Sequence, residues 1–176
     1  MHNENAALSS LANHPTQQSM PFAGHASAIW EELEQISLAG HVPAHGYQGH
    51  DANARAFTAL RHYHGRLIVV SSGLMNIAMR GRRFAISPGS AIWVPPLIRH
   101  RVDTRQGTIF NSIFINFHLM RYLPATPLLF SNSSLLEHLS HAIVAIPEDS
   151  AITKRSKLLA AILIDEIAGA RPLDHF

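Results

Sequence analysis

Hydrophobic residues recur at every second position through the middle of the chain, the period of a β-strand with one buried face. Met75, Ile77 and Met79, for example, alternate with polar or small residues, and glycine or proline separates the segments. Several short strands with tight connections indicate a small β-barrel or sandwich. The strands predicted in this way are Arg66–Val70, Leu74–Arg80, Arg83–Ser87, Ala91–Val94, His100–Asp103 and Thr108–Phe117.

The period changes to that of a helix after Pro127 and a last strand-like LLFS segment. Ser134 and Glu137 have the spacing of a capping box, and an apolar stripe follows them. A second helix is predicted from about Thr153 to Gly169, with Gly169 as its C-terminal cap. The sequence therefore predicts strands first and two helices last.

The first 53 residues show little of either pattern. Residues 1–24 are polar and rich in turn formers, so a mobile arm is expected. Ser27 is a candidate cap for a short helix that ends at Leu38. Residues 40–53 look like a loop whose histidines are solvated. The predicted organisation is an N-terminal arm with a possible helix over 1–53, a β-barrel over 54–130 and a helical segment over 131–176.

Composition narrows the class of protein. A chain of 176 residues that is 47% hydrophobic and 15% charged is expected to fold as one domain, with no membrane-spanning segment. It has no cysteine, so disulfides, thiolate metal sites and a cysteine nucleophile are excluded. The first residues lack the features of a signal peptide, which makes the cytoplasm the expected location.

Charge is concentrated in the central region. Residues 51–110 hold nine arginines against Asp51 and Asp103, although the net charge of the whole chain is only +2. Five of these arginines are scattered over predicted strand ends and turns, without the interleaved aromatic residues of a nucleic-acid surface: Arg80, Arg82, Arg83, Arg99 and Arg101. A solvated surface is therefore the favoured interpretation, with DNA contact as the alternative.

Two segments resemble the motifs of the cupin family. GSAIWVPPLIRH, from Gly89 to His100, is similar to the second cupin motif, with Pro95 and His100 in their usual places. The first motif can be anchored on Gly73, which puts Arg66 at its glutamate, His62 at its second histidine and Leu60 at its first, with Ala54 at its opening glycine. A two-residue shortening brings His62 and His64 into the histidine pair instead.

Four sequence blocks indicate a narrower family than the cupin motifs do. HYHGRLIVVSSG, PGSAIWVPPLIRHRV, SSLLEHLSHAI and KLLAAILIDEIAGA are similar to consecutive blocks of the sensor domain of AraC-type transcription regulators. The resemblance implies a cupin barrel of the double-stranded β-helix or jelly-roll type, followed by two helices. It also implies a small-molecule effector, a homodimer, and a separate C-terminal half that reads DNA. Only 24 residues run from Thr153 to Phe176, so that half is expected to be absent from this chain.

The candidate ligand-binding residues are His62, His64, Arg66, Trp93 and His100. Histidines at alternate positions of a strand share a face, and a third from a neighbouring strand completes a facial metal site. Arg66 stands where the family has a carboxylate, and a permanent cation cannot bind a metal. Hydrogen-bonded pocket histidines without a cofactor are therefore favoured, with a divalent metal on His62, His64 and His100 as the alternative.

Arg66 suits the recognition of an effector's carboxylate or phosphate, although a surface position is equally compatible with the sequence. Trp93 is a candidate for stacking on a ligand, against simple core packing. Met75, Met79, Phe84, Ile113 and Phe117 are expected in the core. No site is assigned to four later histidines: His118, His138, His141 and His175.

The last predicted helix has an apolar surface wider than packing on a small barrel requires. Leu159, Leu163 and Ile167 recur at spacings of four, so they are the candidate dimerisation residues. Three functions remain open: an effector-sensing domain that is not an enzyme, a small cupin metalloenzyme acting as oxygenase or isomerase, and a dimerisation module without a ligand. The resemblance favours the first.

Overall fold

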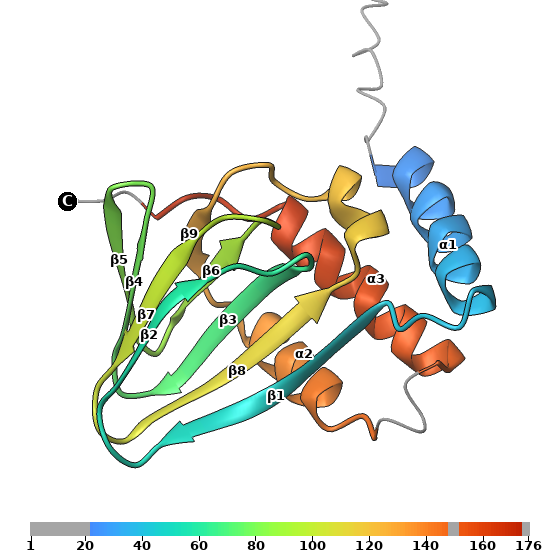
Figure 1. Ribbon diagram of the computed structural model, residues 1–176. Helices are drawn as coiled ribbons and strands as arrows, with labels where there is room; N and C mark the ends of the chain where they lie inside the picture. The colour runs from blue at the N-terminus through green and yellow to red at the C-terminus, as the bar shows by residue number, and fades with distance from the viewer. Residues whose placement is uncertain (1–21, 148–151, 174–176) are drawn as a thin grey trace, which may run out of the picture.

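The computed structural model describes residues 22–147 and 152–173, which form two antiparallel β-sheets and a layer of helices (Figure 1). The five-stranded sheet has the order β1-β8-β3-β6-β9, and the four-stranded sheet has the order β2-β7-β4-β5. The strands are β1 Ala44–Asp51, β2 Arg55–Leu60, β3 Gly65–Ser72, β4 Met75–Met79, β5 Arg82–Ile86, β6 Ser90–Val94, β7 His100–Thr104, β8 Thr108–Ile115 and β9 Leu128–Ser131. The helices are α1 Phe22–Leu38, the 3₁₀ helix η1 Phe117–Tyr122, α2 Ser134–Val144 and α3 Lys154–Ala168.

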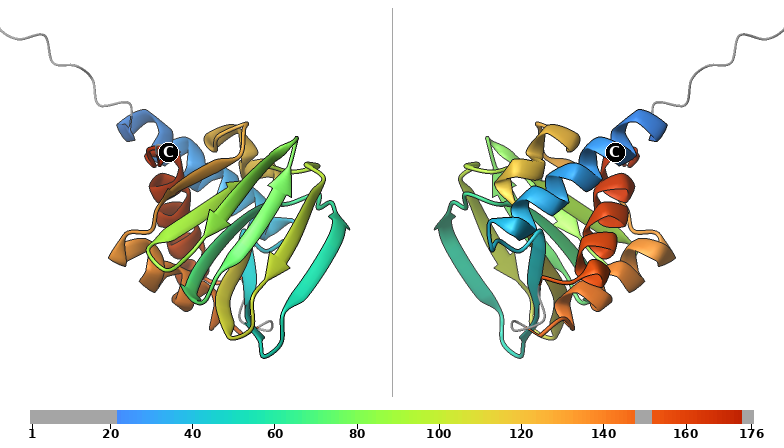
Figure 2. Two further views of the ribbon diagram at one scale, coloured as in Figure 1. Left: turned by 90° about the vertical axis from the view of Figure 1, so that its left-hand side faces the viewer. Right: turned by 90° about the vertical axis from the view of Figure 1, so that its right-hand side faces the viewer.

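The five-stranded sheet lies in the middle of the molecule and is covered on both faces (Figure 2). Its outer face packs on the helices through residues such as Leu67, Val69 and Ile113. Its inner face packs on the four-stranded sheet through Ile68 and Val70, among others. Residues on successive positions of β3 therefore enter two different cores, because side chains alternate across a strand. Within residues 22–147 and 152–173, no helix covers the outer face of the four-stranded sheet (Figure 2).

This architecture confirms the expected mainly β fold followed by two helices. The alternation predicted for β4 is correct, since Met75, Ile77 and Met79 are all buried. Phe84 and Ile113 are core residues as expected, whereas Phe117 is 57% exposed at the start of η1. None of the helices that the described residues form is both long and apolar enough to cross a membrane.

The loop predicted over residues 40–53 is wrong, because β1 occupies Ala44–Asp51. Its sequence AHGYQGHD lacks alternating hydrophobic residues, yet all eight residues pair with β8. The inner face of β1 borders a cavity instead of an apolar core, so the usual signal is missing. The first helix begins at Phe22, before the proposed cap at Ser27. Most of the predicted mobile arm, residues 1–21, lies outside the described residues.

The two C-terminal helices are capped almost as the sequence predicts. Ser133, one residue before the proposed cap, accepts a hydrogen bond from the backbone of Leu136 and begins α2. The capping box predicted for Ser134 and Glu137 is wrong, because the Glu137 carboxylate accepts hydrogen bonds from Ser71 and Asn132 instead. Thr153 and Ser156 form a reciprocal capping box at α3, and Gly169 is its C-terminal cap.

The apolar stripe of α3 faces its own sheet. Leu163 and Ile167 are completely buried in the core between the helices and the five-stranded sheet, and Leu159 packs against that core. The assignment of Leu163 and Ile167 to a dimer surface is therefore wrong, since neither is accessible to a partner. The exposed large apolar residues of α3 are Leu158 and Ile162.

Candidate functional site

A cavity of about 360 Å³ lies between the two sheets, where β1 faces β2 and β7. A volume near 300 Å³ is the lower end of the range for small-molecule sites. Gly49 makes room on β1 for the Phe110 ring, which a Cβ at this position would meet at 2.2 Å. Polar side chains and aromatic rings line this inter-sheet cavity together: Tyr47, Gln48, Gly49, His50, Asp51, Arg55, Phe57, His62, Arg66, Val102, Phe110 and Phe114.

Arg66 is the central charge of the inter-sheet cavity. It lies on β3 and is only 4% exposed. Its Nε donates a hydrogen bond of 2.8 Å to Ser112 Oγ, its Nη2 reaches the Tyr47 hydroxyl at 3.4 Å, and its Cζ lies 5.6 Å from the centre of the Phe114 ring. No carboxylate of the described residues lies within ion-pair distance. Burial lowers the pKa of Arg66 from its usual value, because the charged guanidinium is poorly solvated there.

His62 and His100 lie beside this cation, with ring centres 5.6 Å apart. Nδ1 of His100 lies 2.8 Å from the carbonyl oxygen of Ile98 and must carry the proton of that hydrogen bond. The Nε2 atoms of both histidines are buried without a partner. Burial, and then the charge of Arg66, lower the pKa of His62; burial is also the main cause of the lowered pKa of His100. Both imidazoles are therefore neutral near pH 7 and can accept a hydrogen bond.

The acidic group of the cavity is already engaged. Asp51 accepts a hydrogen bond of 2.6 Å from Thr104 Oγ1 and lies 3.5 Å from Nε of Arg55. Its charge is thus compensated by residues other than Arg66. The cavity holds one cation without an acidic partner among the described residues, beside the neutral imidazole of His62, and this combination suits an acidic ligand.

Three of the five predicted ligand-binding residues do not line the inter-sheet cavity. His100 lines a separate groove formed by the turn between β4 and β5, the loop before β7 and the first residues of β7. Trp93 is buried in the core on the helix side of the sheet, and its Nε1 donates to the Pro124 carbonyl at 2.8 Å. It belongs to the core and cannot stack on a ligand in the inter-sheet cavity. His64 packs edge-on against His45, with ring centres 5.9 Å apart, and lines a second cavity of about 450 Å³ near Ile143.

The three histidines proposed as metal ligands do not converge. His62 and His100 face each other, but His64 lies at the second cavity, and Arg66 occupies the place of the carboxylate ligand. Within residues 22–147 and 152–173, no three histidine, aspartate or glutamate side chains are placed to hold a metal ion. The residues present do not fit a divalent metal, because two neutral imidazoles beside a guanidinium give too few ligands and a repulsive charge.

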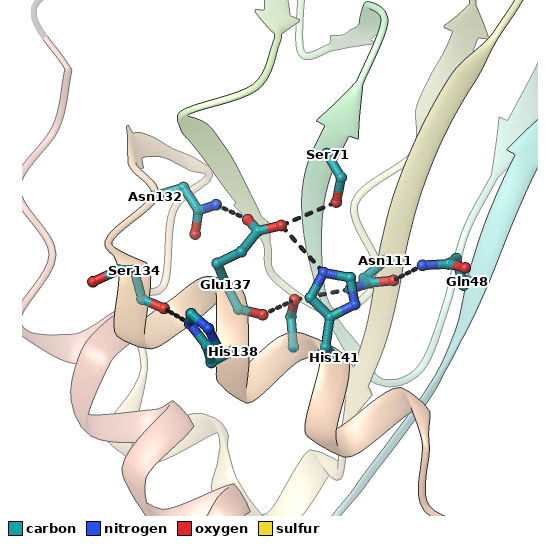
Figure 3. A network of polar contacts seen from close by, with 9 residues as sticks. Gln48, Ser71, Asn111, Asn132, Ser134, Glu137, His138 and His141 are labelled. Atoms are coloured by element: carbon teal, nitrogen blue, oxygen red, sulfur yellow. Dashed lines mark hydrogen bonds and ion pairs between the residues drawn. The ribbon is translucent and has the colours of Figure 1, made fainter.

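Sequence reasoning missed a polar network between α2 and the five-stranded sheet (Figure 3). Glu137 is at its centre: it accepts hydrogen bonds from Ser71 at 3.0 Å and from Asn132, and lies 3.3 Å from His141. Asn111 of β8, which is fully buried, connects His141 and Ser140 of α2 to Gln48 of β1. His141, to which the sequence assigns no site, therefore belongs to this network. The network joins α2 to β1, β3 and β8, three of the strands that line the inter-sheet cavity.

No family model and no curated protein matches this sequence. Solved structures do resemble it. ToxT from Vibrio cholerae strain SCE256, solved with an unsaturated fatty acid bound, aligns over 70% of this chain and 53% of its own, with a TM-score of 0.51 and 9% identity. ToxT from Vibrio cholerae O395, bound to (E)-4-(8-methylnaphthalen-1-yl)but-3-enoic acid, aligns over 70% of this chain and 55% of its own, with a TM-score of 0.48 and 12% identity.

An RmlC-like cupin from Shewanella frigidimarina NCIMB 400 aligns over 43% of this chain and 68% of its own, with a TM-score of 0.40 and 17% identity. This chain spans about half the length of the ToxT chains. At such identities the likeness concerns the fold alone. The chain therefore shares its fold with part of ToxT, over 70% of its own length.

Proposed function

We propose that this chain is the effector-sensing domain of an AraC-type transcription regulator and that it binds a small organic acid in the inter-sheet cavity. In this proposal the domain works in the cytoplasm, forms a homodimer and is not an enzyme. DNA is read by a separate domain.

The observation that carries the proposal is the buried Arg66 guanidinium, which has no acidic partner among the described residues. Keeping an uncompensated cation out of water costs several kcal/mol unless a counter-charge or hydrogen bonds offset it. Ser112 and Tyr47 supply only neutral acceptors. A carboxylate of a ligand would complete the set, since a guanidinium binds it through paired hydrogen bonds.

Two comparisons support this function. The four sequence blocks resemble the sensor domain of AraC-type regulators, and ToxT, a regulator of that family, has the same fold. The ligand of the ToxT structure is an unsaturated fatty acid, which is also a carboxylic acid. The aromatic rings Phe57, Phe110 and Phe114 give the cavity an apolar wall for the rest of such a molecule.

The test compares carboxylic acids with their matched primary amides in a thermal unfolding screen. At a hundred times its Kd, a ligand that binds only the folded state adds about 2.7 kcal/mol, which raises the Tm of a chain of this size by roughly 5–10 °C. We expect at least one aliphatic or aromatic acid to do so while its amide does not. Arg66→Lys should lower the affinity for that acid at least tenfold, because lysine keeps the charge but lacks the paired hydrogen-bond donors of the guanidinium.

Arg61→Lys is the matched control, since Arg61 is exposed and does not line the cavity. A broad set of acids that leaves the Tm unchanged, or a shift that survives Arg66→Lys, would contradict an acid-binding cavity. The first result would instead favour a dimerisation module without a ligand.

The second candidate is a small cupin metalloenzyme. It requires a bound metal, and the position of Arg66 and the separation of His64 from His62 argue against one. Elemental analysis of the purified protein distinguishes the two functions: we expect well under one equivalent of iron, zinc or manganese. A stoichiometric metal that disappears in His100→Ala would establish the alternative.

A further inference from the structure

Five arginines line an open groove at one end of the four-stranded sheet, outside the inter-sheet cavity. The groove has a volume of about 880 Å³ and is formed by the turn between β4 and β5, the loop before β7 and the first residues of β7. Its arginines are Arg80, Arg82, Arg83, Arg99 and Arg101. The arginines lie at strand ends and turns, as the sequence predicts, and the fold brings the two segments that carry them, residues 78–83 and 97–101, together.

Most of this charge has no acidic partner. Arg101 is paired with Asp103, at 3.0 Å. The other four arginines form no ion pair with any residue in the described ranges. Four like charges in one groove repel each other, so an anion that binds there relieves that repulsion.

The sheet holds several of these side chains in defined places. Arg83 and Arg101 lie on either side of Ala78 in the strand register, so they share one face of the sheet with only a methyl group between them. The guanidinium of Arg82 lies 5.2 Å from the centre of the Phe84 ring. The groove therefore presents arginines from neighbouring strands on a rigid support.

The turn at one edge of the groove is an unusual place for an arginine. Arg80 has a φ of 49° and Gly81 has a φ of 74°. These two residues form the turn between β4 and β5, and asparagine or glycine normally occupies the first position of a turn with two positive φ angles. Leu97, on the loop before β7, also has a positive φ, of 61°. A long side chain in the left-handed region costs about 1 kcal/mol or more, and such strain clusters at functional sites.

A buried imidazole lies in the wall of the groove. His100 lines it, is 3% exposed and has an unpartnered Nε2 atom. The remaining lining residues that the structure describes include no Asn, Gln, Phe, Tyr or Trp. Of the side chains that recognise nucleic acid, the groove thus lacks the amides that pair with adenine and the aromatic rings on which bases stack, and it retains the arginines that bind phosphates.

We propose that this arginine groove binds a chain of phosphate groups, as found in a nucleic-acid backbone or in inorganic polyphosphate. A guanidinium matches two phosphate oxygens with parallel hydrogen bonds, and the open shape admits a ligand longer than one phosphate. Recognition here depends on charge and not on base sequence. The inference is independent of the acid-binding cavity, because Arg66 does not line the groove.

The test measures binding of a fluorescein-labelled 20-base-pair duplex of random sequence by anisotropy, and of sodium tripolyphosphate by calorimetry. With three or four phosphate contacts, duplex affinity should fall roughly 40- to 150-fold between 50 and 200 mM salt. The triple variant Arg80→Asn, Arg83→Ala, Arg99→Ala should lower the affinity for both ligands at least tenfold. Asparagine is chosen at position 80 because it tolerates a positive φ.

The control triple Arg61→Ala, Arg105→Ala, Arg155→Ala removes the same charge from exposed positions outside the groove and should change affinity less than threefold. Binding of tripolyphosphate supports a free polyphosphate, and binding of the duplex alone supports a nucleic-acid backbone. Equal losses in both triples, equally tight binding of polyglutamate, or no binding at 50 mM salt would overturn the proposal. Circular dichroism checks folding, and the single variant Arg99→Glu replaces the triple if it unfolds.

Discussion

Two neutral imidazoles and a guanidinium share one poorly solvated cluster in this protein. His62 and His100 face each other at 5.6 Å, and the charge of Arg66 acts on the pKa of both. A proton added to either imidazole would place a second positive charge beside a buried one. The folded state therefore binds these protons more weakly than the unfolded chain does.

Thermal stability should consequently fall as the pH drops below about 6.5, the ordinary histidine value. Above that pH both states are neutral at these positions, so neither histidine contributes. Below it the unfolded chain takes up protons that the folded state excludes, which favours unfolding. The measurement is the Tm by circular dichroism between pH 7.5 and 5.

The double variant His62→Gln, His100→Asn should flatten this dependence, because the amides keep hydrogen-bonding groups without titrating. His138→Gln, on the exposed side of α2, serves as the control and should leave the slope unchanged. If the double variant and the wild type lose stability in parallel over this range, the lowered pKa values of the two histidines are refuted.

The sequence identified part of this cluster and missed the rest for a physical reason. Arg66, His62 and His100 were found because the cupin-like motifs align them. Their partners Ser112 and Phe114 carry no signal of their own, since they are ordinary strand residues. Trp93 was misplaced because the alternation that shows which face is buried disappears when a strand is buried on both faces, as all of β6 is.

Helix α2 is fastened to the sheet by polar contacts as well as by its apolar face. Glu137 receives hydrogen bonds from β3 and from the segment before α2, and Asn111 extends the network to β1. Charge-assisted hydrogen bonds contribute more than neutral ones, but Glu137 remains 29% exposed, which screens its charge.

Glu137→Ala should therefore lower the free energy of unfolding by about 1–2 kcal/mol in urea titrations, and Glu137→Gln by less, because the amide keeps one acceptor. Glu31→Ala, on the exposed face of α1, should change it by less than about 0.5 kcal/mol. Equal effects of Glu137→Ala and Glu31→Ala would mean that the network does not stabilise the fold.

The predicted elements were most accurate where apolar residues face a core. β4 alternates as expected, and the caps of α2 and α3 lie within one residue of the predictions. β1 and β2 were missed because their inner faces border the cavity and carry residues such as Tyr47, Gly49 and Arg55. A strand that builds a binding site gives up the hydrophobic pattern by which strands are recognised.

The helices and the five-stranded sheet share a single core, so the C-terminal segment is part of the body of the protein. Leu163→Ala should lower the free energy of unfolding by about 2–5 kcal/mol, as expected for a fully buried leucine. Ile162→Ala, at an exposed position of the same helix, should cost much less and provides the control.

Oligomerisation can be tested separately with light scattering at tens of micromolar. If the proposed homodimer uses α3, it must use its exposed residues, so the double variant Leu158→Glu, Ile162→Glu should be a folded monomer. A monomeric wild type would contradict the homodimer, and a double variant that remains dimeric would place the interface elsewhere.

The central position of β3 has a kinetic consequence. It is buried from Gly65 to Val70, and it lies between β6 and β8 under both cores. Its amide protons should exchange with deuterium only when the whole molecule unfolds. β2 is an edge strand whose pairing with β7 is interrupted between Phe57 and Leu60, and it lines the cavity through Arg55 and Phe57. Its amide protons should exchange through local opening of the strand. The same opening would let a ligand enter the inter-sheet cavity while the pairing of β3 with its neighbours stays intact.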